Sequence, residues 1–132
     1  MNKSFWLAVA AYLIPTFPIG YFWHLALFAE RYHQLDLYRP DVIIPMGILS
    51  MLTQALLYAW MYPRLFGKCD WKISALRFGA VFGLLSWSYT TLPIAAKYQM
   101  TSIPDFMLLE SGFTLVQFAV VAPLIALAYR GR

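Results

Sequence analysis

Two ionisable side chains near the ends of long apolar segments are the residues of this chain best suited to chemistry. His24 lies near the end of the first apolar segment, and Glu110 lies about 7 Å into the fourth at the 1.5 Å rise of an α-helix. A carboxylate at that depth in hydrocarbon needs a basic partner, a water-filled cleft, a metal or a proton. We therefore expect Glu110 to face the protein interior, paired with His24, Arg31 or Lys97.

The spacing of Glu30 and His33 suggests a second kind of site, which would bind a metal. A carboxylate and an imidazole at positions i and i+3 of a helix converge on one ion, and di-iron bundles use two such pairs. His24 would be the third candidate ligand, but the chain carries one such pair rather than two. A membrane enzyme with a metal at its outer face is therefore an alternative interpretation. No motif identifies a cofactor or a catalytic residue.

Two amides lie in the middle of apolar segments. Gln54 lies 12 residues into the second segment, and Gln117 lies 11 residues into the fourth. Similar depth would allow the two side chains to hydrogen-bond if their helices turn them toward each other, a contact worth about 0.6–2 kcal/mol in a membrane. The contact would serve either as a link between helices or as a polar contact for a ligand.

Aromatic side chains complete the candidate binding site. Tyr21 and Trp23 precede His24 directly, whereas Trp87 lies near the middle of its segment, where its indole N–H needs a partner. The candidate ligand-binding residues are Tyr21, Trp23, His24, Gln54, Trp87, Glu110 and Gln117.

Four apolar segments must position these residues. They are Phe5–Ala29, Val42–Phe66, Ile73–Ala96 and Phe106–Tyr129, each about 24 or 25 residues long against roughly 20 needed to cross a bilayer. The chain is 61% hydrophobic and 12% charged, which is too apolar for a soluble domain of 132 residues. We predict an all-α membrane protein in which residues 1–132 form a single domain of four antiparallel transmembrane helices.

The basic residues predict the orientation of this bundle. The amino terminus, the second loop and the carboxyl terminus, with their flanks, carry seven Lys and Arg residues against one acid, whereas the first and third loops carry three against five. Lys and Arg accumulate on the cytoplasmic side, so both termini are expected in the cytoplasm of a cell with a bacterial-type inner membrane. The net charge of +4 then reflects topology, and nucleic-acid binding is not indicated.

Proline and glycine predict two local features. Pro15 and Pro18 lie within the first segment and are expected to kink it or to widen a turn, because each removes a backbone donor. Gly79 and Gly83 have the spacing that lets another helix approach closely, either within the chain or at the seam of a homo-oligomer.

The leading functional hypothesis is non-catalytic. The short loops favour a small membrane protein that is either an accessory subunit of a larger complex or a binder of lipid or another apolar molecule, with a polar and aromatic vestibule at its outer face. A small proton-coupled transporter that uses Glu110 or His24 is the main alternative. The single Cys69 excludes an internal disulfide framework.

Overall fold

The computed structural model describes residues 2–131, and within that range the chain is helical and contains no strand. Arg132, one of the seven basic residues counted above, lies outside the described residues. The helical elements are α1 (Lys3–Phe22), the π-helix η1 (Trp23–Leu27), α2 (Ala29–Gln34), α3 (Ile44–Leu65), α4 (Trp71–Thr90), α5 (Leu92–Lys97) and α6 (Ile103–Ala128).

Side-chain caps fix where three of the long helices begin. The Asn2 side chain accepts from the backbone N–H of Phe5, and the Asp70 side chain does the same for Lys72. Ser102 caps α6 in the same way. Each cap satisfies one of the amide groups that the first turn of a helix leaves without a partner.

Four helical stretches are long and apolar enough to cross a membrane. They comprise Lys3–Leu27, Ile44–Leu65, Trp71–Lys97 and Ile103–Ala128, and each overlaps one of the predicted apolar segments. Many large apolar side chains on them are exposed, including Ile14, Leu76 and Leu115. The predicted all-helical class and the four membrane-length helices are therefore confirmed.

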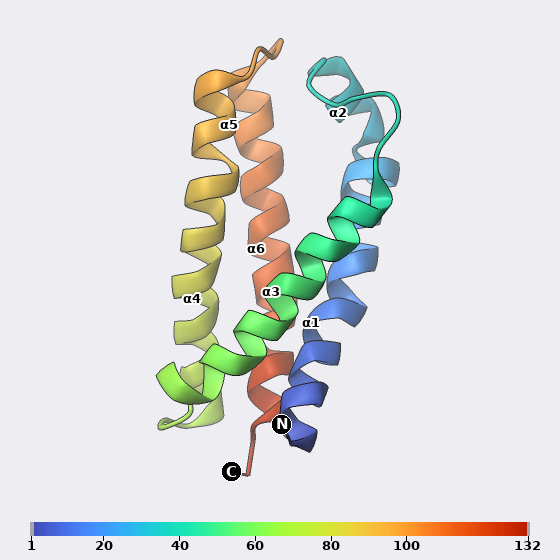
Figure 1. Cartoon of the computed structure of the whole chain (residues 1–132). Coiled ribbons are helices and arrows are strands. Elements are labelled where there is room, and N and C mark those ends of the chain that lie inside the picture. The colour runs from blue at the N-terminus through green and yellow to red at the C-terminus, as the bar shows by residue number, and fades with distance from the viewer. Residues whose placement is uncertain (1, 132) are drawn as a thin grey trace.

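The long helices pack around α6, which lies between α1 and α4 (Figure 1). Helix α3 runs obliquely across α1 and contacts α6 only weakly. Both chain ends lie at one end of the molecule, whereas α2 and α5 lie at the opposite end, which we call the loop end. At the loop end the first and third loops are joined, because the Thr101 hydroxyl donates to the Gln34 carbonyl over 2.7 Å.

Pro15 and Pro18 lie inside one continuous helix. α1 continues through Pro15 and Pro18, and the widened turn comes after them, at η1, where the Phe28 N–H donates to the Trp23 carbonyl. Such an i to i+5 bond defines a π-turn, a feature that often accompanies functional sites. Pro93 lies in the first turn of α5, where a proline is tolerated, and the third span runs on to Lys97.

Two buried clusters hold the helices together. The larger one joins α1, α3, α4 and α6 and contains an aromatic group around Tyr58, Phe78 and Phe82. Gly79 and Gly83 of α4 face α6 of the same chain, where an added Cβ would lie 3.1 Å from Ala122 and 3.3 Å from Phe118. The smaller cluster lies at the loop end and consists of Tyr32, Leu35, Phe106 and Leu109.

Candidate functional site

A carboxylate and an imidazole from two different helices meet at the loop end. Glu110 Oε1 of α6 lies 3.2 Å from His24 Nε2 of η1, and both side chains are largely buried, with exposed fractions of 12% and 18%. The Tyr32 hydroxyl of α2 donates to the same oxygen over 2.6 Å. His24 Nδ1 lies 3.0 Å from the carbonyl oxygen of Gly20. We call His24, Tyr32 and Glu110 the carboxylate cluster.

Tyr32 is held as a hydrogen-bond donor. Its burial, and secondly the neighbouring Glu110 carboxylate, raise the pKa of the Tyr32 phenol above its ordinary value, so the hydroxyl stays protonated at neutral pH. Tyr38 stacks on the Tyr32 ring, with centroids 5.0 Å apart and planes 10° apart. The ring of Phe113 packs edge-on against His24, with centroids 4.5 Å apart. The cluster is therefore enclosed by aromatic rings.

A second polar group lies deeper between the helices, where sequence reasoning placed a contact between two amides. Gln54 and Gln117 do not bond to each other. Instead, Gln117 Nε2 donates to the Tyr12 hydroxyl over 3.1 Å, and that hydroxyl donates to Gln54 Oε1. Gln54 Nε2 in turn donates to Ser50 Oγ over 3.0 Å. We call this hydrogen-bonded series of Gln117, Tyr12, Gln54 and Ser50 the amide chain.

A cavity of about 850 Å³ connects the two polar groups. Along α6, seven residues separate Glu110 from Gln117, or about 10 Å at the rise of an α-helix. Helical spacing brings one stripe of side chains from each helix to the wall, because residues three or four apart share a face. The stripes are Tyr12, Thr16, Gly20 and His24 on α1 and η1; Gly47, Ser50, Met51 and Gln54 on α3; and Glu110, Phe113, Thr114 and Gln117 on α6.

The cavity is open along two glycines. At Gly20 and at Gly47, a Cβ atom would meet nothing within 4 Å. The walls of the cavity are mostly apolar and include Leu25, Ile44 and Met51. Apolar walls with a few convergent polar groups are typical of small-molecule sites.

Five of the seven candidate ligand-binding residues line this cavity: Tyr21, His24, Gln54, Glu110 and Gln117. Trp23 does not line the cavity. Its ring lies tilted against Phe28, with centroids 4.6 Å apart, and packs against the backbone of Gly112. Of the expected basic partners of Glu110, only His24 pairs with it. Arg31 bonds Asp105 over 3.1 Å, and the Lys97 ammonium lies 5.9 Å from the ring of Tyr98.

The candidate metal ligands do not come together. Glu30 and His33 are both exposed on α2, and the Glu30 carboxylate accepts from Gln34 over 3.3 Å, whereas His24 points to Glu110. Across residues 2–131 no group of three His, Cys, Asp or Glu side chains is placed to hold a metal ion.

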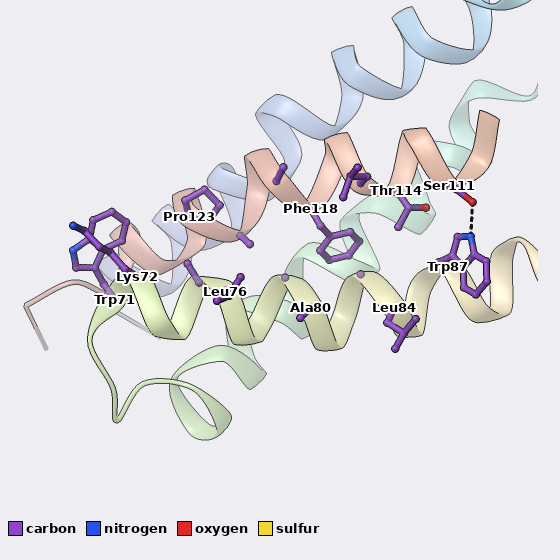
Figure 2. Close-up of a pocket in the computed structure, with 16 residues that line it drawn as sticks. Trp71, Lys72, Leu76, Ala80, Leu84, Trp87, Ser111, Thr114, Phe118 and Pro123 are labelled. Carbon is purple, nitrogen blue, oxygen red and sulfur yellow. Dashed lines mark hydrogen bonds between the residues drawn. The ribbon is translucent and has the colours of Figure 1, made fainter. Parts of the chain in front are cut away.

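Trp87 belongs to a different hollow, a groove of about 670 Å³ between α4 and α6. Its indole N–H donates to Ser111 Oγ over 2.9 Å, at one end of the groove, while Trp71 and Lys72 lie at the other end (Figure 2). Small and apolar side chains such as Ala80 line the middle. Because Trp87 and Ser111 satisfy each other, this groove presents little free polarity compared with the cavity.

Sequence reasoning missed Tyr12, Tyr32 and Tyr38. For Tyr12 a signal was present, because Tyr12, Thr16 and Gly20 continue the stripe of His24 at intervals of four residues. Tyr32 and Tyr38 belong to a segment that was read as a loop and partly folds as α2, and no periodic pattern marks them.

Comparisons with protein-family models, with curated proteins and with solved structures gave no match to this chain.

Proposed function

We propose that this protein binds an amphipathic small molecule or lipid within the membrane, in the cavity between α1, α3 and α6. The observation that carries the proposal is the cavity itself. Its volume of about 850 Å³ suits a ligand of drug or lipid-head size, since such sites span about 300–1,000 Å³. The mostly apolar walls would hold the ligand body, and the carboxylate cluster and the amide chain would orient its polar groups.

The proposal includes an antiparallel four-helix bundle in the inner membrane with both termini in the cytoplasm. The aromatic anchors at the end that carries the termini support this orientation. The Arg64 guanidinium lies 4.3 Å from the centroid of the Trp60 ring, and the Arg130 guanidinium lies 5.6 Å from that of Trp71. Tryptophan with Lys and Arg is typical of the membrane interface, and the basic excess is typical of its cytoplasmic side.

The cavity can be tested with variants that fill it. Gly47→Leu extends a side chain into open space, so the fold should tolerate it. The new side chain would occupy cavity volume that the ligand needs. Ala80→Leu is the matched control, because it adds the same bulk to the separate groove between α4 and α6.

The measurement is native mass spectrometry of protein released from membrane nanodiscs. We expect a small molecule that stays bound to the wild type and to Ala80→Leu but is lost from Gly47→Leu. The reverse result, with loss only from Ala80→Leu, would move the site to the groove. Identical spectra for all three proteins would refute a ligand in the cavity.

A small proton-coupled transporter is the second candidate, favoured by the contact between His24 and Glu110. Reconstituted in liposomes, such a carrier would acidify or alkalise the lumen only when its substrate is present. Glu110→Gln would abolish that flux. Binding without flux would leave the first candidate.

A further inference from the structure

The hydrogen-bond pattern of His24 fixes how many protons the carboxylate cluster holds. Nδ1 faces the Gly20 carbonyl at 3.0 Å, and because a carbonyl only accepts, Nδ1 carries a proton. Nε2 faces Glu110 Oε1 at 3.2 Å. Two bare lone pairs would repel, so one proton lies between them, on the imidazole or on the carboxyl group. In either arrangement the pair carries no net charge.

Among residues 2–131, that shared proton is the positive charge that compensates Glu110. Within residues 2–131 no lysine or arginine forms an ion pair with this carboxylate. The nearby Arg31 and Arg39 are paired with Asp105 and Asp41 instead. A carboxylate in a poorly solvated site needs one compensating charge. Here the shared proton provides the compensating charge, and a positively charged ligand can take its place.

The free oxygen of the carboxylate is available to a ligand. His24 and Tyr32 both contact Oε1, and no described side chain bonds Oε2, while Glu110 lines the cavity. Aromatic rings from four different segments line the cavity together with Glu110, and two of them, Tyr38 and Phe113, contact the His24 ring. The other two are Tyr21 and Tyr98. A carboxylate within a group of aromatic faces is the arrangement that recognises ammonium groups, through charge and through cation–π contacts.

Resting on the proposed function, we infer that the ligand of this cavity is an amphipathic amine or quaternary ammonium whose head contacts Glu110 Oε2 and displaces the shared proton. Before binding, the cluster is neutral, with one proton shared between His24 Nε2 and Glu110 Oε1. After binding, the ligand cation compensates the carboxylate, and the shared proton leaves to solvent while His24 keeps the proton on Nδ1. Because Nε2 and Oε1 then share no proton, their 3.2 Å contact lengthens on binding. Retaining both positive charges would leave a net charge of about +1 in a site of low dielectric constant.

The other titratable and charged groups around the cluster do not compete for this role. Tyr32 of α2, Tyr38 of the first loop and Tyr98 after α5 are phenols. The phenols of Tyr32 and Tyr38 stay protonated at neutral pH, because burial raises the pKa of each above its ordinary value. Arg39 also lines the cavity but is paired with Asp41.

The test compares dodecyltrimethylammonium with neutral 1-dodecanol, added to the full-length protein in nanodiscs. Calorimetry at pH 7 in two buffers of different ionisation enthalpy gives both the affinity and the number of protons released. We expect the cation to bind at least about tenfold more tightly than the alcohol, and to release about one proton per molecule bound. This proton count needs no variant.

Variants then assign the proton to the cluster. Glu110→Gln should lose the cation preference and the proton release while still binding dodecanol, and Glu110→Asp should keep both in weakened form. Glu30→Gln is the matched control, because it makes the same change at an exposed carboxylate of α2 and should behave as the wild type.

The outcomes separate the two proposals. Equal binding of both amphiphiles, without proton release, would refute a cationic ligand and leave the proposed function standing. A cation preference that survives in Glu110→Gln would also refute it. If neither amphiphile binds, both the proposed function and this inference fail.

Discussion

Glu110 and His24, 86 positions apart in sequence, place Oε1 and Nε2 3.2 Å from each other. Three elements that are separate along the chain meet at this contact, because η1 supplies the imidazole, α6 the carboxylate and α2 the hydroxyl of Tyr32. The contact thus joins these three elements at the loop end. Its neighbours can be altered one at a time.

Tyr32→Phe should destabilise the protein by about 1–2 kcal/mol, because it removes a buried hydrogen bond to an acceptor that keeps its desolvation cost. Tyr98→Phe, at an exposed residue of the same end, should cost little. The measurement is the free energy of unfolding in detergent.

The loss of unfolding free energy caused by Tyr32→Phe should also become smaller at high pH. Burial raises the pKa of Tyr32 in the folded protein, so folding favours the protonated phenol. The advantage of the wild type should therefore be complete below about pH 10, where the unfolded tyrosine ionises, and should shrink above it. A difference that grows above this pH would contradict the donor role.

The proposed orientation can be read with cysteine chemistry, since Cys69 is exposed in the loop between α3 and α4. A membrane-impermeant maleimide should leave Cys69 unlabelled in intact spheroplasts and label it after lysis. In a Cys69→Ser background, Gln34→Cys should label before lysis, because residue 34 ends α2 at the opposite end of the molecule. The inverse labelling pattern would overturn the orientation.

The features that depend on local sequence were predictable. Helix length and composition predict four helices of membrane length, and they are present to within a few residues at each end. The partner of Glu110 was narrowed to three residues, because a carboxylate in hydrocarbon requires compensation. In the structure, Glu110 is paired with His24, one of those three residues.

The direction in which a side chain faces was less predictable. The position of Gln54 and Gln117 along their helices was read from the sequence, but position along a helix does not specify rotation about its axis. Tyr12 therefore lies between them and takes both bonds. The facing of Trp87 was not predictable for the same reason. Its indole points toward Ser111 in the groove between α4 and α6 rather than into the cavity.

Two glycines predict opposite effects of the same substitution. Gly112→Ala should destabilise the protein by about 1–3 kcal/mol, because the new Cβ would lie 3.1 Å from the Trp23 ring, which is packed against Phe28. Gly20→Ala should be neutral or stabilising by up to about 1 kcal/mol, since alanine favours the helix and meets nothing within 4 Å. Thermal unfolding in detergent compares the two, and equal effects would show that Trp23 is not tightly packed.

The amide chain predicts a coupling that a direct contact between Gln54 and Gln117 would not. Gln117 is 6% exposed and Tyr12 is fully buried, so loss of either polar partner leaves an unsatisfied group. Gln54→Leu and Gln117→Leu should each cost on the order of 0.6–2 kcal/mol in unfolding free energy. Tyr12→Phe should cost more than either, because it removes both bonds.

The decisive measurement adds each leucine variant to Tyr12→Phe. Once the hydroxyl is gone, the amides have lost their common partner, so each further leucine should cost at least about 0.5 kcal/mol less than it does in the wild type. Thr53→Leu on the exposed side of α3, whose hydroxyl bonds only its own helix, supplies the control and should add independently. Additive costs for Gln54, Gln117 and Tyr12 would mean that the phenol does not join the two amides, and the deep end of the cavity would then lack its organising group.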